Sequence, residues 1–190
     1  MQVDWEVEIG PDAPVIDAQW PGFIDLRLHP ERARTLEETG CFPPLASALE
    51  LLNRSASPIW TSKCDVWEPI EIDVDELDAP HEPGLKALAC YIDLLPQAMD
   101  LWAGVEEAVR WCELCCVRLK NVPLASSRVD LIVRRAENGG RENALGVTAY
   151  LVACAPQAQE AARRLDRTLG SFADIVATSA SARPADRGND

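Results

Sequence analysis

Apolar and polar residues alternate at the start of the chain. Val3, Trp5 and Val7 are separated by acidic residues, and this period of two predicts a strand with one face against a core and one acidic face toward water. Similar runs predict further strands over 22–28, 59–67, 128–136, 144–154 and 172–178, and 85–95 is an apolar segment. Residues 137–143, rich in Asn and Gly, predict an exposed hairpin loop between two of these strands.

Helical periodicity separates these strands. Apolar residues recur at i, i+3, i+4 and i+7 in three segments, which predicts helices over 44–54, 97–120 and 156–169. A short helix over 30–39 is predicted from Pro30 in its first turn and Gly40 at its end. Gly40 and Gly170 follow two of these segments and suit C-terminal caps. The apolar stripe of the longest segment includes Cys112, Cys115 and Cys116 and leaves Trp111 off its inward face.

The order of elements predicts an α+β fold with an antiparallel or mixed sheet and helices on one face. The last two β-α-β units would give β-α-β-β-α-β, a ferredoxin-like arrangement in which right-handed crossovers keep the helices together. We expect residues 1–178 to form a single domain and the polar residues 179–190 to form a flexible tail. The sheet face without helices would be solvated, capped by the segment 68–83, or paired with another subunit.

Composition and charge narrow the classes of partner. The net charge of -13 disfavours nucleic acid and anionic membranes, whose binding needs clustered Lys and Arg. No apolar run approaches the roughly 20 residues of a membrane span, and the first residues are acidic where a signal peptide is basic. We therefore expect a cytoplasmic protein, with its seven cysteines as reduced thiols. Only three of the 18 basic residues are lysines, which suggests a GC-rich bacterial genome.

Two clusters could bind a metal. The spacing of Cys112, Cys115 and Cys116 suits zinc or thiol exchange, but their helical stripe favours core packing and no second pair of ligands completes a zinc site. The acidic segment 65–82 carries eight carboxylates around a histidine, without Lys or Arg. Its oxygens and imidazole could gather a divalent cation, with candidate ligands Asp65, Asp73, Asp75 and His81. A solvated run of charge is the alternative we favour, because the spacing matches no calcium loop.

The strand 59–67 offers a candidate ligand-binding patch. Alternation places Lys63, Asp65 and Trp67 on one face beside the acidic segment, with Trp60, Cys64 and Val66 opposite. They would contact a ligand if this face is concave, and would otherwise be ordinary surface residues.

Catalytic signatures are missing from the sequence. It has no Gly-x-Ser-x-Gly elbow, phosphate-binding glycine loop or His-Glu-x-x-His motif, and no cofactor is implied. The leading hypothesis is a non-catalytic binding or protein-interaction module that uses its sheet face, with a homodimer as one arrangement suggested by Trp67 and Trp111. The alternative is a small metal-binding protein or enzyme at the acidic segment.

Overall fold

A mixed six-stranded sheet is the centre of the computed structural model, which describes residues 1–98, 101–138 and 141–179. Its strands run in the order β1-β5-β6-β4-β3, and β2 pairs with the end of β5. β1 and β2 are parallel to β5, while the pairs β5–β6, β6–β4 and β4–β3 are antiparallel. The strands are β1 (Gln2–Glu8), β2 (Ile16–Asp17), β3 (Ile59–Trp67), β4 (Lys86–Pro96), β5 (Ser127–Asn138) and β6 (Arg141–Ala155). The mixed sheet and α+β class confirm that part of the prediction.

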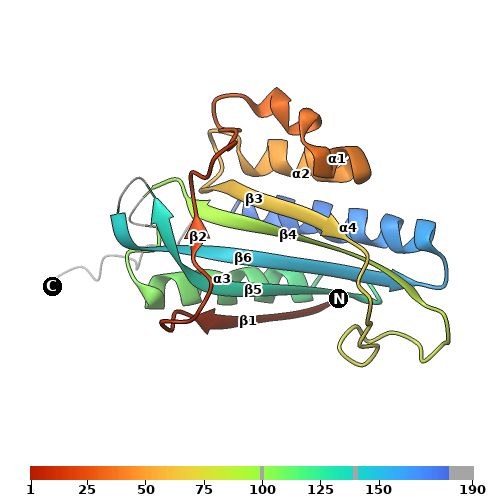
Figure 1. Ribbon diagram of the computed structural model, residues 1–190. Helices are drawn as coiled ribbons and strands as arrows, with labels where there is room; N and C mark the ends of the chain where they lie inside the picture. Colours follow the sequence, from red (N-terminus) through yellow and green to blue (C-terminus); the bar gives the residue numbers. More distant parts are fainter. Residues whose placement is uncertain (99–100, 139–140, 180–190) are drawn as a thin grey trace, which may run out of the picture.

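Helices cover one face of this sheet (Figure 1). α3 and α4 pack behind the strands, α2 packs against α4 beside β3, and α1 and the 3₁₀ helix η1 lie farther out. The helices are η1 (Pro30–Thr35), α1 (Glu37–Cys41), α2 (Pro44–Leu52), α3 (Val105–Lys120) and α4 (Ala158–Val176). The core lies between this helical layer and the inward strand residues, such as Val129, Leu131, Val147 and Leu151.

Among the described residues, only segments at the two ends cover the opposite face of the sheet. At one end, β2 crosses the strands, and Ile16 and Ala18 pack with Trp60 and Leu95. At the other end, the segment 68–85 folds back so that Leu77 and other apolar residues pack on the strand ends. The segments that the structure describes leave the central part uncovered, and we call it the open face.

The hairpin prediction is confirmed, and its strands extend farther than expected. β5 and β6 pair up to Asn138 and Arg141. The ladder thus occupies much of the predicted loop 137–143, and residues 139–140 lie outside the described residues.

The strand predicted over 22–28 is wrong, because this segment forms turns. Gly22 has a positive φ of 95°, a conformation that favours glycine. The Asp25 carboxylate accepts hydrogen bonds from the Arg27 backbone N–H at 3.0 Å and from its guanidinium Nε at 2.8 Å. A side chain that bonds to its own local backbone offers the chain an alternative to a ladder.

The strand predicted over 172–178 is also wrong, because α4 continues through Gly170 to Val176. Phe172 and Val176 extend the buried stripe of Leu165 and Leu169 at helical spacing. Gly170 therefore does not cap the helix. Without a strand after α4, the described chain does not have the predicted β-α-β-β-α-β order.

The longest predicted helix begins later than expected. α3 starts at Val105, after Gly104 at the N-cap position in an extended conformation. Trp111, predicted to point outward, is only 2% exposed, and its Nε1 donates a hydrogen bond to the Ser179 carbonyl at 2.9 Å. Ser179 is itself buried, so the first residue of the predicted tail packs on the domain. Residues 180–190 lie outside the described residues.

Candidate functional site on the open face

A β-bulge in β3 decides which side chains reach the open face. Thr61 pairs with Leu94 and Cys64 pairs with Ile92, so three steps along β3 oppose two along β4. The extra residue reverses the alternation. Trp60 consequently packs on the β2 side, while Cys64 and Val66 pack toward the helices. The predicted common face of Trp60, Cys64 and Val66 is therefore wrong.

A single row of side chains crosses the open face through all five long strands. The strand pairings align Asp65 of β3 with Tyr91 of β4, Tyr91 with Tyr150 of β6, Tyr150 with Asp130 of β5, and Asp130 with Asp4 of β1. Opposite residues on adjacent strands project from the same face. This cross-strand row thus places two tyrosines between carboxylates.

Trp67 joins the two tyrosines in an aromatic cluster. Its ring centroid lies 6.3 Å from that of Tyr91 and 6.4 Å from that of Tyr150, and the tyrosine centroids are 5.9 Å apart. The Trp67 residue is 38% exposed. Burial, together with Asp93 and Asp65, raises the pKa of Tyr91 to about 12, so its phenol keeps its proton at neutral pH. The cluster offers π faces beside negative charge.

Two hollows adjoin the aromatic cluster. The β3 hollow, a cavity of about 580 Å³, follows the outer edge of β3 and is lined by Tyr91, Trp20 and Lys63 together with the acidic residues Glu37, Glu38 and Asp65. The β1–β5 hollow, about 240 Å³, is lined by Tyr150 and Arg128 together with the acidic residues Asp4, Glu6 and Asp130. Since Tyr91 and Tyr150 touch, the aromatic cluster links the two hollows. In each hollow three carboxylates face one basic side chain.

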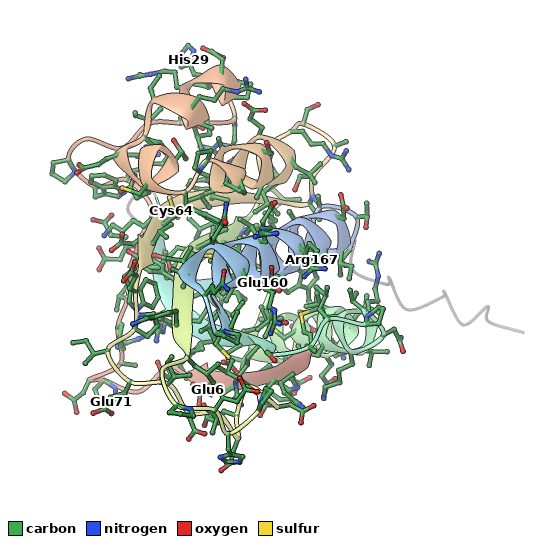
Figure 2. The ribbon with its side chains drawn as sticks, turned by 90° about the vertical axis from the view of Figure 1, so that its right-hand side faces the viewer. Glu6, His29, Cys64, Glu71, Glu160 and Arg167 are labelled. Atoms are coloured by element: carbon green, nitrogen blue, oxygen red, sulfur yellow. The ribbon has the colours of Figure 1, made fainter. Side chains whose placement is uncertain are left out.

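Arg128 is largely neutralised by its neighbours. Its Nε donates to both Asp130 oxygens at 2.9 and 2.7 Å, and its Nη1 lies 3.9 Å from Glu76. A third cavity of about 440 Å³ continues from Arg128 and Asp130 beneath the acidic segment and includes Glu71. Figure 2 shows Glu71 on the side of the sheet away from Glu160 and Arg167 of α4. This end of the open face is therefore strongly negative.

A chain of polar contacts fixes the middle of the open face. The Arg134 guanidinium binds Glu8 at 2.8 Å and reaches the Thr148 hydroxyl at 3.3 Å, and that hydroxyl donates to the buried Asp93 carboxylate at 2.6 Å. Arg134 also lies 5.7 Å from the Tyr150 ring centroid. Burial raises the pKa of Asp93, against the opposing effects of Thr148, Arg134 and Lys63. These contacts fix the side chains on which the Tyr150 ring packs.

Both outer strands have an amide donor occupied by an aspartate. The Asp65 carboxylate accepts the Val66 N–H at 2.7 Å, and the Asp4 carboxylate accepts the Trp5 N–H at 2.9 Å. A strand that adds to a sheet edge needs such donors free. These bonds disfavour edge pairing and leave the face as the surface for a partner, while each carboxylate keeps further acceptor sites.

The predicted ligand patch lies at this site. Asp65 and Trp67 belong to the cross-strand row and the aromatic cluster, and Lys63, in the bulge, lies 5.8 Å from the Trp20 ring centroid and lines the β3 hollow. Their role in binding stays a prediction. Sequence reasoning missed Tyr91, Tyr150, Asp130 and Asp4, because the row exists only through the strand register.

The predicted metal ligands are brought together only in part. His81 Nε2 lies 3.1 Å from Asp75, while the Asp73 carboxylate accepts the backbone N–H groups of Asp75 and Glu76. Across residues 1–98, 101–138 and 141–179, no group of three or more His, Cys, Asp or Glu side chains is arranged to hold a metal ion. A metal site at Asp65, Asp73, Asp75 and His81 gains no geometric support from the described residues.

The three helical cysteines are buried, as predicted, and are free thiols. Burial raises the pKa of Cys115 to about 12 and of Cys116 to about 11. These thiols are therefore protonated at neutral pH and pack as small apolar groups.

Comparison with known proteins found no match to this chain. No family model matches the chain, and no curated protein and no solved structure is similar to it. Within the described ranges, every helix is too short or too polar to span a bilayer. The functional argument therefore depends on the site itself.

Proposed function

We propose that this chain is a non-catalytic binding module whose open face takes an extended, basic segment of another polypeptide. The observation that carries the proposal is the aromatic cluster between two acidic hollows. Aromatic faces attract ammonium and guanidinium groups, and carboxylates bind the same cations through charge-assisted hydrogen bonds. A ligand fits this arrangement if it has basic side chains at both ends, for the two hollows, and a middle part that packs on the aromatic cluster.

The dimensions of the row set the length of the segment. Adjacent strands lie roughly 4.8 Å apart, so three strand spacings from Asp65 to Asp130 span about 14 Å and four, to Asp4, about 19 Å. An extended chain rises about 3.3 Å per residue. The site thus suits about four to six residues lying across the strands, and the occupied edge donors support this orientation over strand addition.

Charge complementarity supports a basic occupant over an acidic one. The whole chain has a net charge of -13, and a field of one sign accelerates association with a ligand of the opposite sign. A second copy of this chain would bring the same negative charge. The predicted homodimer has weaker support for this reason, and because Trp111 is buried while Trp67 alone of the pair is exposed.

Calorimetric titration with two probe peptides tests the proposal. A hexapeptide of alternating arginine and glycine should bind the protein, and its glutamate and glycine counterpart should not. Changing exposed carboxylates in the two hollows, Glu6→Gln with Glu37→Gln, should weaken binding several-fold, since each rim charge contributes about 0.5–1 kcal/mol. The matched control, Glu106→Gln with Glu113→Gln on α3, removes the same charge from exposed helical positions. Equal losses in both double variants would mean that only net charge attracts the peptide.

A variant of the aromatic cluster separates the site from general charge. Tyr150→Leu keeps all carboxylates and removes the ring shared by the cluster and the β1–β5 hollow. We expect binding of the arginine peptide to weaken by roughly fivefold to thirtyfold, which corresponds to the energy of a desolvated cation–π contact. Unchanged affinity in a folded Tyr150→Leu variant would refute the role of the aromatic cluster.

A further inference from the structure

Another cavity lies on the helical side of the molecule, away from the acidic open face. It has a volume of about 250 Å³ and lies between the loop 123–125 and α4. Its polar lining comes from Ser127 at the start of β5 and from Glu160, Arg164 and Arg167 of α4. Figure 2 shows Glu160 and Arg167 on α4.

Positive charge exceeds negative charge at this cavity. Glu160 is shared by three guanidinium groups, those of Arg163 at 3.7 Å, Arg164 at 3.4 Å and Arg167 at 3.8 Å. One carboxylate cannot neutralise three cations, and these separations are long for charge-assisted hydrogen bonds. The residues 121–127 add no acidic side chain. The local excess of positive charge therefore persists in a chain that is acidic overall, because salt screens distant charges beyond about 10 Å.

The second observation is a buried hydroxyl without a partner. Ser127 is 1% exposed, lines the cavity, and its Oγ makes no hydrogen bond among the described residues. A buried polar group left without a partner destabilises the fold, because its desolvation is not compensated by a hydrogen bond. The preceding residue, Ser126, has a positive φ of 53°, a conformation that non-glycine residues rarely adopt. The chain thus bears local strain where it places an unpaired donor beside two arginines.

We propose that this cavity binds a phosphate-type oxyanion. Such an anion is small enough for the cavity. Two of its oxygens can accept a pair of hydrogen bonds from a guanidinium group, here that of Arg164 or Arg167, and another oxygen can accept the hydrogen bond that the Ser127 hydroxyl has available. Arg164 is held in place by its Nη1, which donates to the Cys154 carbonyl at 2.9 Å. Arg167 is 60% exposed and is free to close over the anion by releasing Glu160.

Inorganic phosphate is the probe, titrated calorimetrically against the full chain with sodium chloride at matched ionic strength as the control. Phosphate should bind and should raise the melting temperature beyond the effect of chloride. Arg167→Gln should weaken binding about tenfold, the equivalent of one hydrogen bond to a charged group. Arg163→Gln is the matched control, because Arg163 is equally exposed at 62% and contacts the same Glu160, but does not line the cavity. It should change affinity less than about twofold.

Ser127→Ala separates a binding role from a structural one. The variant should be as stable as the unmodified chain or more stable without phosphate, because it removes an unpaired buried hydroxyl, and it should bind phosphate several-fold more weakly. Equal losses of affinity in Arg167→Gln and Arg163→Gln would overturn the proposal, since they would indicate general charge attraction. A stabilisation by phosphate no greater than that by chloride would also overturn it, as would full affinity in Ser127→Ala.

Discussion

Replacing Trp111 with phenylalanine should destabilise the protein strongly, although sequence periodicity places this residue outside the apolar stripe. The indole is 2% exposed, its Nε1 donates to the Ser179 carbonyl at 2.9 Å, and its ring lies 5.0 Å from that of Trp102 in an edge-on arrangement. Phenylalanine keeps a six-membered ring but cannot donate the hydrogen bond. The end of the described chain would lose a contact that holds it against α3.

The magnitude follows from these contacts. A buried carbonyl left without its donor costs about 1–3 kcal/mol, and a weakened aromatic pair costs about 0.5–1.5 kcal/mol. The free energy of unfolding should therefore fall by about 1.5–4.5 kcal/mol. With a urea m-value of about 2 kcal/mol/M, the middle of the usual range, the unfolding midpoint should shift by roughly 1–2 M.

Urea denaturation followed by circular dichroism measures this shift. Trp67→Phe is the matched control, because the substitution is the same but Trp67 is 38% exposed on the open face. We expect the control to change the free energy of unfolding by less than about 1 kcal/mol. Equal and small effects of both variants would show that Trp111 is not anchored as described.

Three further predictions concern single residues. Burial raises the pKa of Asp93 above its ordinary value of 3.8. Between these two pKa values the native state holds a proton on Asp93 that the unfolded state has lost, so the free energy of unfolding falls as pH rises through this range. Asp93→Asn should abolish this pH dependence and raise the melting temperature at pH 7. Gly146→Ala should lower the free energy of unfolding by about 1–3 kcal/mol, because a Cβ would lie 3.0 Å from the Leu94 backbone oxygen and 2.6 Å from Ile16 Cδ1. Urea denaturation would measure this change. A thiol reagent should label the exposed Cys41 rapidly and the buried Cys115 only on unfolding, as mass spectrometry of timed samples would show.

The sequence is most informative where a periodic pattern has one explanation. β1, β3, the β5–β6 hairpin and the body of α3 follow from alternation or helical spacing. The C-terminal part of α4 did not, because the apolar residues 172–178 suit either a short strand or a helix when read alone. These residues form a helix because, in helical conformation, they continue the stripe of Leu165 and Leu169 that packs in the core.

The site was predictable only in part for a related reason. Lys63, Asp65 and Trp67 stand on one short segment, so alternation could group them. The tyrosines come from β4 and β6, and their alignment with Asp65 depends on strand order and register. The bulge at residues 62–63 also has no signature in this sequence, yet it sets which face Trp60 joins.

The most direct test of the open face as a binding site is a two-dimensional ¹H–¹⁵N spectrum of the tryptophan indole N–H groups during titration with the arginine and glycine hexapeptide. Trp67 lies in the aromatic cluster and Trp20 lines the β3 hollow, whereas Trp102 and Trp111 are buried on the helical side. The indole signals of Trp67 and Trp20 should shift and saturate together while those of Trp102 and Trp111 stay in place. Saturable shifts of Trp102 and Trp111 without movement of Trp67, or no shift of any indole signal at saturating peptide, would contradict the proposed function.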